Sequence, residues 1–184
     1  MPSDRSVRTF AGSHALGGCR AFTLIEILIV VVILGILGAI VLPNFSDAAH
    51  IARENTLKDE LRYLRTQIVV YKAQHRDTPS GYPGGNRAAA PTEAEFLRQM
   101  TGTTDDLSAV GARSATFCYG PYLSKMPQNP LNGLSTILIV PNGQLMPPAG
   151  QPDESTGWIY KAATLELMPN SSGVDADGIR YLDY

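Results

Sequence analysis

The first candidate for chemistry is a single carboxylate, Glu26, which lies in the apolar run from Phe22 to Pro43. It is the only ionisable residue of that run. A carboxylate at membrane depth is costly, and it is kept there only where it pairs with another group or has a function. The sequence therefore marks Glu26 as a functional residue.

A second candidate is the pair Asp175 and Asp177, which precedes Gly178 near the C-terminal end of the sequence. Oxygen ligands at alternate positions before a glycine are typical of calcium-binding loops. The EF-hand pattern is incomplete here, because its first aspartate and its closing glutamate are missing. A simple Asp-Gly turn is the alternative, and the residues alone leave both interpretations open.

Three other groups have simpler interpretations. Asp47, His50 and Glu54 share one helical face at ligand-like spacing, but a solvated charged face explains them better than a metal site. His75 lies near the end of a predicted helix, where a histidine complements the helix dipole. Cys118 is interpreted as a small buried apolar residue, with no disulfide partner once Cys19 is removed with a leader.

Known catalytic patterns do not occur in the sequence. We find no nucleophile elbow, phosphate loop, dinucleotide fingerprint or zinc-ligand spacing, so we predict that the protein is not an enzyme. The net charge of −2 provides no basic field, which argues against nucleic acid as a partner.

The run at 22–43 that carries Glu26 has the length of a membrane span, since about 20 apolar residues cross a bilayer as a helix. A polar lead at 1–21 with a net charge of about +2 precedes the span. Positive residues before a span keep that end in the cytoplasm, so the body of the chain is expected to be exported. An uncleaved single-pass anchor fits this pattern too.

Residues 44–76 continue the helix in amphipathic form. Apolar residues recur mostly every three or four positions, which predicts a buried stripe on one helix face: Phe45, Ala48, Ala52, Leu57, Leu61, Leu64, Ile68 and Tyr71. Glu54 and Lys58 are spaced as a favourable i,i+4 ion pair.

Residues 77–184 form the predicted exported head. A capping box of Thr92 and Glu95 opens a short helix that reaches about Met100. Strands are predicted at 135–140, 158–163 and 165–168, the last two as antiparallel neighbours, and Asn142-Gly143 indicates a hairpin turn. The expected fold class is α+β, with the helix stripe packed on a sheet.

The residues from Arg20 to Glu26, with sequence RAFTLIE, resemble the processing motif of type IV prepilins and type II secretion pseudopilins. Ala21 stands where that family usually has glycine. The resemblance implies cleavage between Ala21 and Phe22 by a prepilin peptidase, followed by N-methylation of Phe22. It also implies that Glu26 pairs with the amino terminus of a neighbouring subunit during assembly.

The head is also similar to that of the major pseudopilin, in the segments 120–133 and 157–170. The chain departs from that pattern at Leu165, where the family usually has a glycine in a tight turn. The resemblance implies the pilin fold, in which a long N-terminal helix packs on a small antiparallel sheet with long loops. It also raises interest in a calcium ion at Asp175 and Asp177, because major pseudopilins often bind calcium in their C-terminal loops.

The resemblance implies a structural pseudopilin that polymerises through its N-terminal helix into a pseudopilus for protein export. Its expected partners are identical and minor pseudopilins, the prepilin peptidase and the inner-membrane secretion platform. The expected location is the inner membrane, with the N-terminus cytoplasmic and the head in the periplasm or outside the cell. A type IV minor pilin for adhesion or DNA uptake, and an uncleaved membrane-anchored binding module, are the alternatives.

Overall fold

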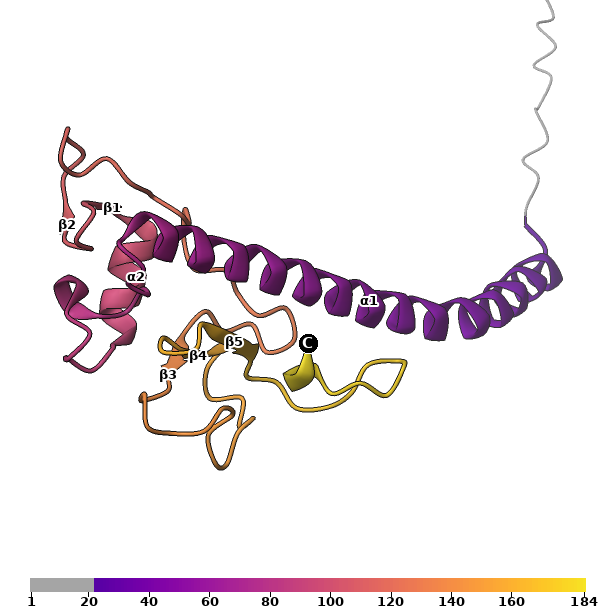
Figure 1. Ribbon diagram of the computed structural model, residues 1–184. Helices are drawn as coiled ribbons and strands as arrows, with labels where there is room; N and C mark the ends of the chain where they lie inside the picture. The colour runs from indigo at the N-terminus through magenta and orange to yellow at the C-terminus, as the bar shows by residue number, and fades with distance from the viewer. Residues whose placement is uncertain (1–21) are drawn as a thin grey trace, which may run out of the picture. The chain divides into compact units, whose positions relative to one another are not determined.

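The computed structural model describes residues 22–184, with side chains described at every position except 40–47. The predicted leader at 1–21 lies outside this range. The elements follow in the order α1 (Leu24–Gln74), η1 (Pro83–Gly85), α2 (Glu93–Thr101), β1 (Thr103–Thr104), β2 (Val110–Gly111), β3 (Ile137–Ile139), β4 (Trp158–Lys161), β5 (Glu166–Pro169) and η2 (Tyr181–Asp183) (Figure 1).

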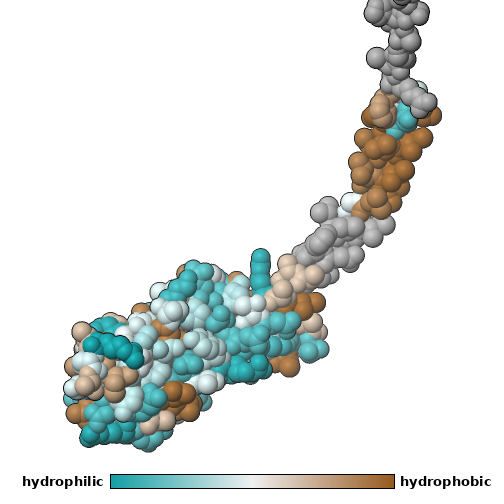
Figure 2. Space-filling model, turned by 90° about the horizontal axis from the view of Figure 1, so that it is seen from above, coloured by the Kyte–Doolittle hydropathy of each residue, from teal (hydrophilic) through white to brown (hydrophobic). Residues whose placement is uncertain are grey.

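The chain divides into two units, Met1–Asn44 and Phe45–Tyr184. In the described part of the first unit, the large apolar side chains from Phe22 to Leu37 are exposed, by between 47% and 86%. They form the brown surface of this unit in Figure 2. Over the described side chains, no helix is both long enough and apolar enough to cross a membrane.

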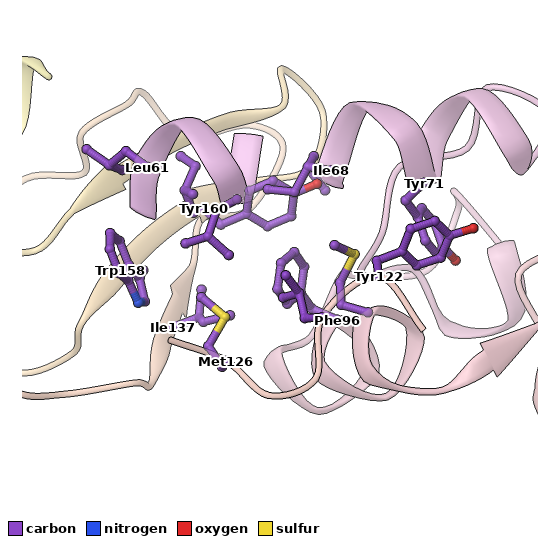
Figure 3. Close-up of a cluster of buried hydrophobic side chains, with 14 of the residues drawn as sticks. Leu61, Ile68, Tyr71, Phe96, Tyr122, Met126, Ile137, Trp158 and Tyr160 are labelled. Carbon is purple, nitrogen blue, oxygen red and sulfur yellow. The ribbon is translucent and has the colours of Figure 1, made fainter. Parts of the chain in front are cut away.

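The second unit is built around the predicted stripe of α1. Leu57, Leu61, Leu64, Ile68 and Tyr71 are each no more than 1% exposed, which confirms this part of the stripe. They pack in one cluster with aromatic and aliphatic residues of the head (Figure 3): Phe96, Met100, Tyr122, Met126, Ile137, Trp158 and Tyr160. The core of the head therefore includes this half of α1.

Strand pairing confirms the α+β class but corrects one detail. β4 and β5 are antiparallel, with Trp158 opposite Pro169 and Lys161 opposite Glu166, as expected. β3 pairs parallel with β4, so the sheet of order β3-β4-β5 is mixed rather than wholly antiparallel. A separate antiparallel pair joins β1 to β2.

The parallel pairing of β3 and β4 follows from their long connection. A parallel pair needs a crossover of a dozen residues or more, and residues 140–157 supply that length. The hairpin predicted at Asn142-Gly143 is wrong. The amide of Gln144 donates to the carbonyl of Pro141 at 3.0 Å, so a turn forms there, but no strand follows it directly.

The second helix begins where its cap residues predict. Thr92 is in an extended conformation with φ −132°, and its side chain accepts a hydrogen bond from the amide of Glu95 at 3.3 Å. An oxygen at this position satisfies an amide that the helix itself leaves without a partner. Helix α2 ends at Thr101, within one residue of the prediction, and Gly102 is its C-cap.

Candidate functional site: the N-terminal carboxylate and the C-terminal loop

Glu26 forms a reciprocal cap at the start of α1. Its Oε2 accepts from the Thr23 amide and the Thr23 hydroxyl, both at 3.3 Å, and its own amide donates to Thr23 Oγ1 at 3.3 Å. This is a capping box, in which a threonine and the glutamate three residues later satisfy each other's backbone amides. The carboxylate is thus held at the N-terminal end of the helix, where its negative charge is favoured by the helix dipole.

The spacing Thr23-x-x-Glu26 indicates this cap in the sequence, and the cap is a second role for Glu26 beside the assembly contact that the resemblance implies. Phe22, the predicted new amino terminus, is 75% exposed. Ala21, on the other side of the predicted cleavage bond, lies outside the described residues. The carboxylate therefore lies four residues from the predicted terminus, and among the described residues it is held by exposed hydrogen bonds to Thr23.

The Asp175 carboxylate lies at the opposite end of the sequence and contacts α1. Its Oδ2 accepts from Lys58 Nζ at 3.3 Å and from the Tyr184 hydroxyl at 2.6 Å. Its Oδ1 accepts from the amides of Asp177 at 3.0 Å and Ile179 at 2.9 Å. The Tyr184 hydroxyl is the largest of the influences that lower the pKa of Asp175, to about 2.

These contacts do not fit the calcium site predicted for Asp175 and Asp177. A carboxylate offers about four lone-pair positions, and four donors already reach Asp175. Asp177 is exposed and reaches Asp175 through its backbone amide. Among the described residues, no group of three or more histidine, cysteine, aspartate or glutamate side chains is arranged to hold a metal ion.

Glu54 does not form the pair with Lys58 that its spacing predicts. It is 5% exposed, and its Oε1 accepts from the Tyr181 hydroxyl at 2.8 Å and lies 3.1 Å from His50 Nδ1. Burial, followed by the contact with Glu54, raises the pKa of Tyr181 to about 12. Glu54 and Lys58 therefore both contact the C-terminal segment. Asp47, which was predicted to share a helix face with His50 and Glu54, has no described side chain.

Two further sequence interpretations are wrong. His75 is fully buried, and its burial lowers its pKa, so it is not a charged complement to the helix dipole. The basic residue in the last turn of α1 is Lys72. Cys118 is exposed rather than buried, because it lies in the loop that follows β2 and not under the sheet.

Comparison with known proteins identifies the N-terminal motif that carries Glu26. Residues 17–42 match the family model of the prokaryotic N-terminal methylation motif. The type II secretion system core protein G of Klebsiella pneumoniae is 26% identical over 111 residues, which are 60% of this chain and 68% of that protein.

The proteins of the same name from Pseudomonas aeruginosa and Dickeya chrysanthemi are 38% and 34% identical. Those alignments cover 34% and 35% of this chain, and 44% and 42% of the relatives. No solved structure gives a significant match. The chain therefore carries the N-terminal methylation motif on a pilin-like α+β fold, and it is similar to the type II secretion pseudopilins.

Proposed function

We propose that the chain is a structural pseudopilin of a type II secretion system, similar to the major subunit. Its role is mechanical rather than enzymatic: subunits stack through their N-terminal helices into a pseudopilus that serves protein export. The proposal rests on the methylation motif at 17–42 and on relatives named as core protein G.

One structural observation supports this proposal most strongly. The large apolar side chains from Phe22 to Leu37 are exposed in the single chain, whereas the stripe from Leu57 to Tyr71 is fully covered by the head. Exposing so much contiguous apolar surface to water is unfavourable, at roughly 25 cal/mol per Å². The segment therefore needs an apolar environment, which lipid supplies before assembly and neighbouring helices supply within a filament.

Processing follows from the same motif. In this proposal a prepilin peptidase cuts between Ala21 and Phe22, and the new amino group of Phe22 is methylated. Before assembly the chain is a single-pass protein of the inner membrane, with its N-terminus cytoplasmic and its head in the periplasm or outside the cell. Identical and minor pseudopilins and the inner-membrane secretion platform are its partners.

The mass of the mature amino terminus tests the class of protein. A chain that begins at N-methylated Phe22 is the expected result, measured by mass spectrometry of protein purified from its own host. A chain that keeps residues 1–21 would instead support the uncleaved anchor. Deletion of the gene should abolish export of secreted proteins; loss of adhesion or DNA uptake with normal export would support the type IV pilin.

The charge of Glu26 can be separated from its role as a helix cap. Glutamine also serves at this position of a capping box, so Glu26→Gln keeps the cap and removes the charge. We expect Glu26→Gln to be cleaved and inserted but to fail to join filaments, because it cannot pair with the amino terminus of a neighbour. Quantitative cross-linking of subunits in the membrane measures this.

Thr23→Ala is the matched control for this experiment. It removes the hydroxyl that caps α1 but keeps the carboxylate of Glu26, and loss of a cap costs about 0.5–2 kcal/mol of helix stability. We expect Thr23→Ala to assemble more nearly like the wild type than Glu26→Gln does. Equal assembly of Glu26→Gln and the wild type would show that the charge is not needed.

A further inference from the structure

The last described segment contains a tight loop organised around one carboxylate. Val174 and Arg180 pair as an antiparallel bridge, and the amide of Gly178 donates to the carbonyl of Asp175 at 3.0 Å. Gly178 has φ +81°, a conformation that glycine adopts readily. Within the loop, the Asp175 side chain accepts the amides of Asp177 and Ile179, so its carboxylate sets the backbone conformation.

The same carboxylate joins the loop to α1. The Asp175 side chain is 2% exposed and that of Lys58 is 41% exposed, so the lysine approaches from the edge of a buried acid. Lys58 Nζ also lies 4.4 Å from the centre of the Tyr184 ring. The ammonium thus contacts a carboxylate and an aromatic face together, and both interactions favour a positive charge at this point.

We infer that the ammonium of Lys58 neutralises the Asp175 carboxylate and fixes the C-terminal loop on α1, the role that a bound calcium ion would otherwise have there. Calcium binds carboxylate oxygens at about 2.3–2.6 Å and collects six to eight of them or of similar ligands. At Asp175 it would have to displace donors from the chain itself and would be repelled by the ammonium of Lys58.

The consequence is a C-terminal loop whose docking on α1 is independent of metal. A neighbouring contact supports this, since the Tyr181 hydroxyl donates to Glu54 one helical turn before Lys58. Two adjacent turns of α1 therefore contact the segment 175–184 through Glu54 and Lys58. The inference goes beyond the proposed function, because it concerns the single subunit and holds whether or not that subunit joins a pseudopilus.

Amide hydrogen exchange of the full chain in mild detergent tests this inference. The amides of Asp177 and Ile179 are direct reporters, because both donate to Asp175. In Lys58→Met, which keeps the aliphatic stem but not the charge, we expect both amides to exchange about tenfold faster or more, as loss of a charge-assisted hydrogen bond predicts. The amides of β4 should be unchanged and report that the core remains folded.

Adding about 1 mM calcium, a concentration that fills weak extracellular calcium sites, should leave exchange in the wild type as it is in the presence of a chelator. Lys58→Arg should keep the protection of the loop. Lys72→Met is the matched control, because Lys72 lies on the same helix in an ion pair with Asp77 at 3.1 Å. Calcium-dependent protection of the wild-type loop, or unchanged exchange in Lys58→Met, would overturn the inference.

Discussion

At the scale of single residues, His75 is a buried histidine whose neutral form is favoured by its surroundings. Its ring stacks on Tyr71 with centroids 3.9 Å apart, and its nitrogens contact the Tyr71 carbonyl at 2.6 Å and Thr104 Oγ1 at 2.8 Å. Burial lowers its pKa below 6.5, and this outweighs the opposite influence of the Tyr71 carbonyl and of Asp105 and Asp106.

This pKa shift predicts a pH dependence of stability. Below pH 6.5 the unfolded chain takes up a proton at His75 more readily than the folded chain does. The free energy of unfolding should therefore fall as the pH drops from about 7.5 to about 5. Chemical denaturation followed by the fluorescence of Trp158, the single tryptophan and a fully buried one, measures this.

His75→Gln should weaken this loss of stability, because glutamine does not titrate in this range. His50→Gln is the control, since His50 lies on the same helix with an exposed side chain, and it should retain the wild-type loss. An equal pH dependence in the wild type and in His75→Gln would contradict the prediction.

The contacts of Glu26 can be predicted from the sequence, whereas those that Asp175 makes with α1 cannot. The cap partner of Glu26 is Thr23, three residues away, so the motif Thr-x-x-Glu contains the whole interaction. The side-chain partner of Asp175 on α1 is Lys58, which lies 117 residues away in the sequence. No local pattern indicates such a partner, so the Asp-x-Asp-Gly sequence left a calcium loop and a simple turn both open.

At the scale of elements, the turn between β4 and β5 holds an unusual residue. Residues 162–165 form this turn, and Leu165 has φ +62°, in the left-handed region. The tight turn therefore forms, although Leu165 stands where the family usually has glycine. Leu165 also packs against the core, so its side chain contributes burial while its backbone is strained.

Replacing Leu165 separates these two effects. Leu165→Ala and Leu165→Gly both remove the packing, but only glycine adopts this φ without a penalty of about 1–2 kcal/mol. We therefore expect the glycine variant to be more stable than the alanine variant by about 1 kcal/mol, the reverse of the order in helices. Denaturant midpoints compare the two, and an alanine variant of equal or greater stability would contradict the strain.

Local signals predicted α2, β3, β4 and β5 of the head, but not η1, β1, β2 or η2. Caps at Thr92 and Gly102 delimit α2, and the predicted strands at 158–163 and 165–168, close together in the sequence, correspond to β4 and β5. The parallel pairing of β3 with β4 was not predictable in this way, because it depends on how the 18 residues at 140–157 return along the sheet. The turn signal at Asn142-Gly143 therefore indicates a turn within this connection and not a hairpin.

At the scale of the whole molecule, the second half of α1 is part of the head. Ile68 is fully buried in the shared core, and its neighbour Val69 is 55% exposed on the other face of the helix. We expect Ile68→Ala to cost about 2–5 kcal/mol of stability, and Val69→Ala to change it by no more than about 0.5 kcal/mol. Denaturation of the full chain compares them; similar costs would place the core elsewhere.

Contacts between α1 and the C-terminal part of the chain determine when, during synthesis, the core of the head can form. Glu54, Lys58 and Arg65 of α1 bind Tyr181, Asp175 and the carbonyl of Leu167, which are synthesised more than a hundred residues later. Until those residues have been synthesised, the stripe from Leu57 to Tyr71 is not covered by the rest of the head. Each newly made chain therefore passes through a stage in which a bilayer surface or a chaperone must shield that stripe.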